Sequence, residues 1–208
     1  VLAVTIALVG IQSAEAQSKS KFKYVDAATL NIINKIDQDC APFSRINAEK
    51  YEARKSLGKT STGVAILFRT NSRIIDAKWT TLKSKIGNNS TPILHSGLDL
   101  YIRDNGKWIF AGVGRPTFNS TEHKFTIVKR MAEGTKECML YLPMHNGVTS
   151  LELGIEEGAS IEPMESPFKY KMAFIGSSIT HGSSASRPGA TYVARIGREL
   201  NAEMANIG

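Results

Sequence analysis

The residue types best suited to chemistry lie in the short segment Gly176–Gly182, which reads Gly-Ser-Ser-Ile-Thr-His-Gly. It places two hydroxyl groups, on Ser177 and Ser178, and the imidazole of His181 between glycines whose backbone freedom permits a tight turn. A serine hydroxyl acts as a nucleophile when a base takes its proton and backbone N–H groups stabilise the oxyanion that forms. A serine in this loop is therefore a candidate for acyl transfer.

The flanking segments predict how the loop is held. Tyr170–Ile175 is a short apolar run, which fits a strand buried on both faces of a parallel sheet. Thr191–Met204 has apolar residues at helical spacing. The order of strand, small-residue loop and helix is the opening unit of an α/β domain, which presents such a loop at the carboxyl edge of the sheet, where ligands bind.

Other interpretations of the bare loop stay open. Its spacing differs from Gly-x-Ser-x-Gly, so it is not the nucleophile elbow of α/β-hydrolases. It lacks the lysine of a phosphate-binding P-loop. A structural Gly/Ser turn, or a nest of backbone N–H groups for an anion, fits the same residues.

The loop resembles the first block of the GDSL/SGNH hydrolases, Gly-Asp-Ser-[Ile/Leu]-Thr-x-Gly. Ser186–Tyr192 resembles a branch of SGNH esterases, often found in bacteria that degrade polysaccharides, in which a β-sandwich module precedes the hydrolase domain. Gly97–Tyr101 is similar to the Gly-x-Asp-Leu-Tyr signature of that module, and Tyr141–Gly147 fits it too. The resemblance extends over about residues 24–208.

This resemblance implies Ser178 as the catalytic nucleophile, with its own backbone N–H as one oxyanion donor. Ser177 stands where many relatives have Asp, and we expect it to accept a hydrogen bond inside the turn instead. Asn206–Gly208 is similar to the start of the second block. The remaining oxyanion donors, Gly and Asn, and the Asp-x-x-His pair that supplies the base are expected after Gly208, so that this chain holds only the nucleophile block.

The four histidines of the chain are weaker candidates for the base. The side chain of His181 is expected to point along its helix rather than back onto Ser178. His95, His123 and His145 fall in the predicted sandwich, where surface and turn positions are the usual ones, and His145 is the best placed of the three. Trp79 and Trp108 are each expected to lie in the core or at the rim of the sandwich, and stacking on a sugar is the alternative.

Short β-rich segments separated by turn residues precede the loop and predict an antiparallel β-sandwich of jelly-roll-like type over residues 24–162. Asp104-Asn105-Gly106 is a hairpin signal, and Pro163 and Pro167 bracket a linker. The predicted fold is thus mainly β: this sandwich, then the first β-α unit of an α/β/α SGNH hydrolase domain over residues 168–208. The expected strands are 63–70, 97–102, 107–112, 123–130, 137–142, 149–155 and 171–175.

Residues 1–16 have the character of a secretory signal peptide that begins inside its apolar region. An uncharged apolar run, too short to span a bilayer, is followed by Ala14-Glu15-Ala16, a small-x-small cleavage pattern. We therefore expect a secreted or periplasmic protein without stable membrane insertion after cleavage. A buried N-terminal strand or helix is the alternative.

Charge and cysteine content restrict the remaining partners. The net charge of +7 is spread along the chain rather than gathered in a basic stripe, so no nucleic-acid partner is expected. Two cysteines and four histidines form no metal-ligand spacing, and no cofactor is expected. Cys40 and Cys138 either form a disulfide in an oxidising compartment or are two separate thiols.

Two functions follow from these observations. The first is an exported serine ester hydrolase acting on a small-molecule or polysaccharide ester, with acetylated carbohydrate suggested by the resemblance alone. In that case the 208 residues by themselves are expected to be inactive, because a nucleophile without its base loses most of its rate. The alternative is a non-catalytic carbohydrate-binding or structural sandwich with a vestigial hydrolase tail.

Overall fold

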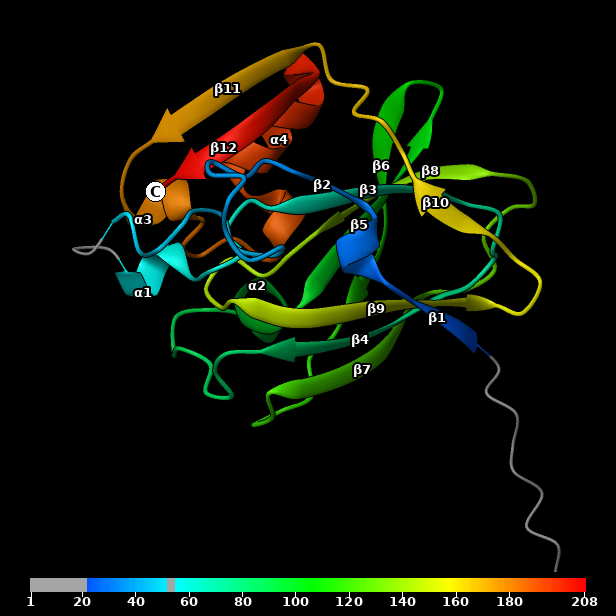
Figure 1. The fold of residues 1–208 in the computed structure, drawn as a ribbon, viewed down its shortest axis with the longest axis horizontal. Coiled ribbons are helices and arrows are strands. Elements are labelled where there is room, and N and C mark those ends of the chain that lie inside the picture. Colours follow the sequence, from blue (N-terminus) through cyan, green and yellow to red (C-terminus); the bar gives the residue numbers. More distant parts are fainter. Residues whose placement is uncertain (1–21, 52–54) are drawn as a thin grey trace, which may run out of the picture.

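The computed structural model describes residues 22–51 and 55–208 (Figure 1). The predicted signal peptide, residues 1–16, lies outside the described residues. The described chain is mainly β, with two antiparallel sheets followed by a smaller α/β unit, which confirms the predicted fold class. None of its helices has the length and apolar character needed to traverse a bilayer.

The first sheet has four antiparallel strands. Its order is β1 (Phe22–Asp26), β9 (Val148–Glu156), β4 (Ile75–Thr81) and β7 (Glu122–Val128). Strand β4 lies at the centre of this sheet, although the sequence analysis did not identify it. Its alternation is nevertheless regular, because Ile75, Ala77 and Trp79 all lie in the core between the sheets.

The second sheet is also antiparallel. Its order is β10 (Ile161–Pro163), β3 (Ala65–Thr70), β8 (Lys136–Tyr141), β5 (Leu98–Asp104) and β6 (Lys107–Gly114), with β2 (Asn31–Ile33) paired to β3. The hairpin β5–β6 turns at Asn105 and Gly106, which have φ of 47° and 80°. Positive φ at both positions is what the Asn-Gly dipeptide provides at low cost.

The central strands of the second sheet, β3 and β8, are buried on both faces. On β3, Ile66 and Phe68 face the core shared with the first sheet, while Ala65 and Leu67 face outward into a second apolar cluster. That second cluster also contains Ala194, from the C-terminal unit. The near-continuous apolar character of β3 therefore follows from a sheet covered on both sides.

Short elements complete the sandwich: η1 (Ala27–Thr29), α1 (Lys55–Gly58) and α2 (Pro92–Ser96). The segment between β1 and Ile33 forms the 3-10 turn η1 followed by the short strand β2. In helix α2 the N-cap Thr91 accepts a hydrogen bond from the N–H of Leu94, and proline occupies its first turn.

The C-terminal unit contains β11 (Tyr170–Ile175), α3 (Ser178–His181), η3 (Pro188–Ala190), α4 (Tyr192–Leu200) and β12 (Ala202–Ile207). The prediction of one helix over 191–204 was wrong at its end. Asn201 adopts the left-handed conformation at φ 53° and ends α4. Beyond it Ala202, Met204 and Asn206 are buried alternately, as in a strand, and β12 pairs in parallel with β11.

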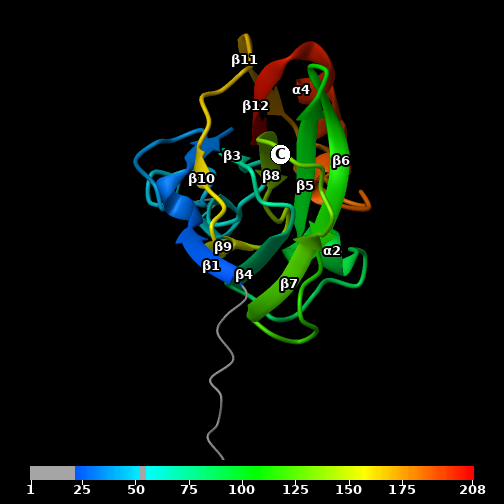
Figure 2. The same ribbon diagram turned by 90° about the vertical axis from the view of Figure 1, so that its right-hand side faces the viewer.

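Strand β11 is largely exposed, which corrects the prediction of a strand buried on both faces. Tyr170, Met172 and Ile175 are 61%, 41% and 81% exposed. The only strand paired with β11 in the described structure is β12, and one face of this pair packs on α4 through Phe174 and Met204. Figure 2, read with Figure 1, shows β11, β12 and α4 together at one end of the sandwich.

Candidate active site

The loop after β11 presents Ser178 as the first residue of α3, at the carboxyl end of the strand. Gly182 ends this helix at φ 111°, where its N–H bonds the carbonyls of Ser178 and Ile179 at 3.2 and 3.1 Å. A Cβ at position 182 would lie 2.8 Å from Thr191 and 2.9 Å from Met144. Both the conformation and the close approach therefore require glycine.

Ser178 itself is exposed, and no hydrogen bond of its hydroxyl is found within the described residues. Its backbone N–H lies in the first turn of α3, where helical N–H groups have no partner within the helix. An exposed hydroxyl beside unengaged N–H donors can attack a carbonyl and stabilise the oxyanion that results. Ser177 is the N-cap of α3 but makes no side-chain capping bond, so the expected contact of its hydroxyl inside the turn is not formed.

A cavity of about 680 Å³ lies beside this loop. It is enclosed by both parts of the chain, because the segment between β2 and α1 faces the nucleophile loop and the end of β12. Figure 1 shows these segments, far apart in sequence, side by side near the last residue. The residues that line it are Ile36, Arg45, Ile46, Tyr51, Leu57, His145, Gly176, Ser177, Ser178, His181, Ser183, Ile207 and Gly208.

His181 is buried, and its ring is engaged by backbone groups. Its Nε2 lies 2.7 Å from the carbonyl oxygen of Met144, and its Nδ1 lies 3.2 Å from that of Gly208. No hydrogen bond joins it to Ser178 within residues 22–51 and 55–208. Burial, and then the nearby charge of Arg45, lower the pKa of His181, so the ring is neutral at pH 7.

His145 stacks on His181 with ring centroids 4.9 Å apart and an angle of 11° between the planes. Burial, followed by the proximity of His181 and His95, lowers the pKa of His145 to about 4. A base with so low a pKa accepts a proton poorly at neutral pH. The structure thus brings Ser178 and two predicted histidines to one cavity, but it provides no Ser–His hydrogen bond among the described residues.

The other residues considered from sequence lie away from the cavity. His95 stands next to His145, with 6.2 Å between ring centroids, and His123 bonds Thr81 on the first sheet at 3.0 Å. Trp79 is buried and donates a hydrogen bond of 2.8 Å to the carbonyl of Ser96, so it is a core residue. Trp108 is half-buried and packs against Phe168.

The Gly-x-Asp-Leu-Tyr signature has a structural role that the sequence analysis did not identify. Asp99, fully buried on β5, accepts a 2.8 Å hydrogen bond from the N–H of Gly189 and lies 3.3 Å from Nε of Arg187. Burial raises the pKa of Asp99 to about 6, although Arg187 and the Gly189 N–H oppose that rise. A Cβ at Gly189 would collide with the ring of Tyr101. The signature residues Asp99 and Tyr101 therefore form the part of the sandwich against which the loop leading into α4 packs.

Arg198 of α4 also contacts both Gly189 and Tyr101. Its Nη2 donates a 2.7 Å hydrogen bond to the carbonyl of Gly189, and its guanidinium lies 4.0 Å from the ring centroid of Tyr101. Further along, the hydroxyls of Thr180 in α3 and Tyr192 in α4 are 2.8 Å apart. These contacts link the sandwich to the helix that carries Ser178.

Arg45 is a cavity residue that the sequence analysis did not identify. It is 4% exposed, and its Nη1 donates to the carbonyls of Asn206 and Gly208 at 3.0 and 2.9 Å. Burial lowers the pKa of Arg45 to about 10, which leaves the side chain charged at neutral pH. Arg45 lies on the segment between β2 and α1, far from Ser178 in the sequence. No local pattern identifies it, because only the fold brings it to the cavity that Ser178 lines.

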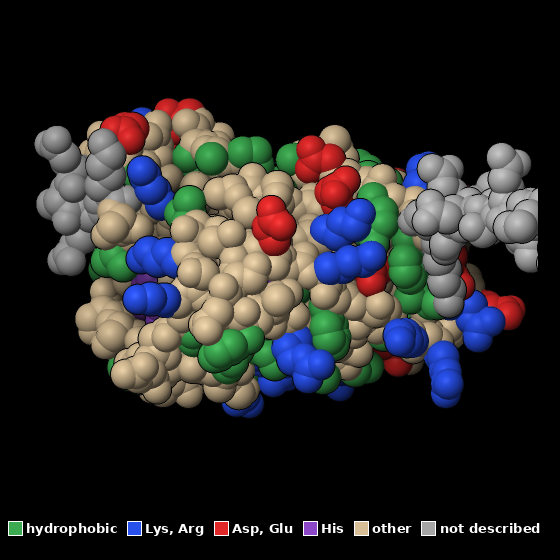
Figure 3. Space-filling model, turned by 90° about the horizontal axis from the view of Figure 1, so that it is seen from below, with side chains coloured by type: hydrophobic (Ala, Val, Ile, Leu, Met, Phe, Trp, Pro, Cys, Tyr) green, Lys and Arg blue, Asp and Glu red, His purple; other side chains and the backbone are tan. Residues whose placement is uncertain are grey.

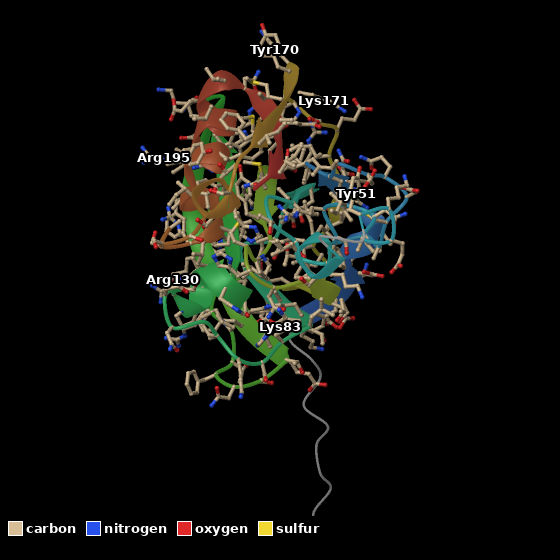
Figure 4. All side chains as sticks on the ribbon, turned by 90° about the vertical axis from the view of Figure 1, so that its left-hand side faces the viewer. Tyr51, Lys83, Arg130, Tyr170, Lys171 and Arg195 are labelled. Atoms are coloured by element: carbon tan, nitrogen blue, oxygen red, sulfur yellow. The ribbon has the colours of Figure 1, made fainter. Side chains whose placement is uncertain are left out.

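Figures 3 and 4 show two further faces of the molecule. Lys and Arg side chains are scattered over the face in Figure 3, with Asp and Glu among them. Figure 4 shows Tyr51 on the segment between β2 and α1, while Tyr170 and Lys171 lie at the start of β11. Cys40 and Cys138 are both free thiols, so of the two alternatives the structure shows unpaired cysteines.

Comparison with known families identifies both parts of the chain. Residues 22–161 match the family model for the GxDLY N-terminus of SGNH-hydrolase-type esterases. Residues 169–208 match the GDSL-like lipase/acylhydrolase family. No curated protein matches the sequence.

Solved structures share the architecture. A GDSL-like lipase from Bacteroides ovatus ATCC 8483 is 40% identical with a TM-score of 0.86, over 90% of this chain and 56% of that one. A salicylyl-acyltransferase from a tetracycline biosynthetic pathway is 22% identical with a TM-score of 0.68, over 89% and 54%. A family two carbohydrate esterase from Cellvibrio japonicus is 11% identical with a TM-score of 0.52, over 88% and 51%. The chain thus spans little more than half of these proteins.

Proposed function

The chain belongs to the SGNH-hydrolase-type esterases with a GxDLY N-terminus, and from this we propose that it forms part of an exported serine ester hydrolase whose nucleophile is Ser178. The proposed substrate is a carboxylic ester on a carbohydrate, with acetyl as the acyl group. The proposed division is a sandwich module over residues 24–162 and a hydrolase unit that starts at residue 168.

One observation carries this proposal: the exposed hydroxyl of Ser178 lies at the start of α3, on the wall of a 680 Å³ cavity. Cavities of this size hold small organic molecules. Residues of both the nucleophile loop and the sandwich line the cavity, so we expect a bound substrate to contact the N-terminal module as well.

The reaction follows from these positions. Oγ of Ser178 attacks the ester carbonyl carbon while its proton passes to a histidine base, and the carbonyl oxygen becomes an oxyanion facing the N–H of Ser178. The C–O bond to the alcohol breaks, and the alcohol leaves with the proton. Water then attacks the acyl-enzyme, again with proton transfer to the base, and releases the carboxylic acid and Ser178.

His145 and His181 do not fit the role of base, because one has a strongly lowered pKa and the other is held by two backbone carbonyls. In our proposal the base is a histidine held by an aspartate, as the family pattern implies, and neither is among residues 22–51 and 55–208. The carbohydrate substrate is supported by the resemblance to esterases of polysaccharide-degrading bacteria and by the shared fold with a carbohydrate esterase. Export is supported by the character of residues 1–16.

The test is ester hydrolysis by the protein as its native host produces it, assayed on 4-nitrophenyl acetate and on acetylated xylan. Ser178→Ala is expected to lower kcat/KM at least about 1000-fold. Ser186→Ala is the matched control, because this exposed serine of the same unit does not line the cavity. Equal activity of Ser178→Ala and wild type would refute the nucleophile. Absence of hydrolysis in both, with sugar binding retained, would favour a non-catalytic module.

A further inference from the structure

Helix α3, which presents Ser178, is too short to hold its own position. It is a single turn of four residues, Ser178–His181. One isolated helical turn is unstable, because it fixes several backbone torsions for few hydrogen bonds. Its N-cap, Ser177, adds no side-chain capping bond. The position of Ser178 therefore depends on the groups that hold α3 from outside.

Part of this support comes from the C-terminal unit itself. The hydroxyl of Thr180 lies 2.8 Å from that of Tyr192, and Nδ2 of Asn206 donates a 2.7 Å hydrogen bond to the carbonyl of Thr180. These contacts hold α3 to α4 and to β12. They lie within the unit that carries Ser178, so they do not fix Ser178 relative to the sandwich residues that line the cavity.

The side chain of His181 joins α3 to the sandwich. Its Nε2 lies 2.7 Å from the carbonyl oxygen of Met144 and 3.2 Å from the hydroxyl of Thr62. Because a carbonyl oxygen can only accept, Nε2 donates to Met144. All three residues are buried, and both partners belong to the sandwich. Loss of this donor would leave α3 without a buried hydrogen bond to the module that faces it.

The acceptor of this hydrogen bond is held firmly within the sandwich. The N–H of Met144 donates to the carbonyl of Leu94 in α2 at 3.0 Å, and the hydroxyl of Thr62 donates to the carbonyl of Met144 at 2.6 Å. The ring of His181 is also stacked on His145, with an angle of 11° between the planes. A fixed acceptor and a stacked ring together restrict the imidazole to one position.

Backbone hydrogen bonds connect this imidazole to the nucleophile. The N–H of His181 donates to the carbonyl of Ser177 at 2.9 Å, and the N–H of Gly182 donates to the carbonyl of Ser178 at 3.2 Å. A shift of His181 therefore moves Ser178 with it. Misplacing a reacting group by about 1 Å can lower a rate about 100-fold.

We propose that His181 is a positioning residue, whose hydrogen bond to the carbonyl of Met144 holds the nucleophile helix against the sandwich. It acts through the placement of Ser178 and takes no proton from it. The proposal rests on the proposed function for the reaction of Ser178, but not for the attachment of α3. It makes the sandwich a part of the active-site scaffold, since Thr62 and Met144 supply the contact.

Kinetics of the host-produced protein on 4-nitrophenyl acetate test the positioning role. His181→Phe keeps a planar ring but removes the donor, and it is expected to lower kcat at least about tenfold with KM changed less than about twofold. His181→Gln retains an N–H donor of similar reach and is expected to keep kcat within about threefold of wild type, with the same pH profile. Glutamine cannot act as a base, so this rescue separates positioning from proton transfer. Equal losses in the two variants, or wild-type kcat in His181→Phe, would overturn the proposal.

His123→Phe is the matched control, because His123 is also buried in the sandwich and its Nε2 also bonds a neighbour, Thr81, at 3.0 Å. It lies away from the cavity, so kcat and KM are expected to stay unchanged. An equal fall in kcat in this control would assign the effect to packing and overturn the proposal. Should His181→Phe fail to fold, the nearly isosteric Thr62→Val decides: it is expected to lower kcat at least about threefold, and wild-type kcat would contradict the proposal.

Amide exchange tests the attachment without any ester. In the host-produced protein, exchange of the peptide that contains α3 is measured by mass spectrometry. It is expected to be at least about tenfold faster in His181→Phe than in the wild type or His181→Gln, and unchanged in His123→Phe. Equal exchange in His181→Phe and the wild type would overturn the proposal. If no ester is hydrolysed the proposed function fails, while exchange still decides whether His181 holds α3.

Discussion

The carboxylate of Asp99 accepts a 2.8 Å hydrogen bond from the backbone N–H of Gly189, a residue 90 positions later in the chain. Asp99 belongs to a central strand of the sandwich, and Gly189 belongs to the loop between α3 and α4. This contact, with Arg187 beside it, gives the Gly-x-Asp-Leu-Tyr signature a physical meaning. It attaches the sandwich to the unit that presents Ser178.

Removal of this carboxylate is expected to destabilise the protein. Asp99→Ala leaves the buried Gly189 N–H and the Arg187 guanidinium without their acceptor, so the free energy of unfolding is expected to fall by about 3 kcal/mol. Asp104→Ala, at the exposed end of the same strand, is the control and is expected to change it by less than about 0.5 kcal/mol. Urea unfolding measures both, and a loss below about 0.5 kcal/mol for Asp99→Ala would contradict the assigned contact.

His145 is expected to make stability depend on pH between about 6.5 and 4. Its pKa in the folded protein is lowered to about 4, so it stays neutral there while the unfolded chain takes up a proton below its ordinary value. The contribution of this group to the free energy of unfolding is therefore lost as the pH falls through this range and is complete above about pH 6.5. An NMR titration is expected to show His145 protonating near pH 4, and a midpoint near 6.5 would refute the buried stack with His181.

Strand β11 is expected to be less protected from amide exchange than the central strands of the sandwich. It pairs only with β12 in the described structure and is mostly exposed, whereas β8 lies between β3 and β5. In the 208-residue chain, amide exchange at 173–175 is therefore expected to be at least about 100-fold faster than at 139–141. Equal protection of the two strands would show that β11 is packed more firmly than its exposure indicates.

The two thiols are expected to differ in reactivity. Burial raises the pKa of Cys138 to about 12, while Cys40 is half-buried and lies in the segment between β2 and α1. A thiol-specific reagent at pH 8 is expected to modify Cys40 and spare Cys138 in the native protein, and to modify both after unfolding. Peptide mapping by mass spectrometry assigns the sites, and a disulfide between the two would contradict the structure.

The sandwich could be predicted from sequence because turn residues separate its strands clearly. Asn105-Gly106 fixes one hairpin, and the apolar residues of β3 and β8 alternate between two buried faces. Strand β4 was not identified although its alternation is regular, since the face opposite the core carries Asp76 and Lys78, residue types that are depleted in strands. Strand β12 was taken as helix because Tyr192, Ile196, Leu200 and Met204 continue one helical spacing across the turn at Asn201.

The site was only partly predictable for a different reason. Ser178 lies in a contiguous motif, which local sequence reveals. Arg45 and Asp99 contact residues 206 and 189, which are distant in sequence, and such pairings depend on the whole fold. His181 was considered as a base on the basis of its proximity in sequence, yet its ring nitrogens are engaged by the carbonyls of Met144 and Gly208.

The central claim, that Ser178 is the nucleophile of an ester hydrolase, is tested most directly by covalent labelling. The protein as its native host produces it is treated with a fluorophosphonate, which phosphonylates activated serines, and is then mapped by mass spectrometry. Our account predicts one modified residue, Ser178, with loss of ester hydrolysis in step with labelling and no labelling of Ser178→Ala. Labelling at another serine, or an active protein whose Ser178 stays unmodified, would contradict it.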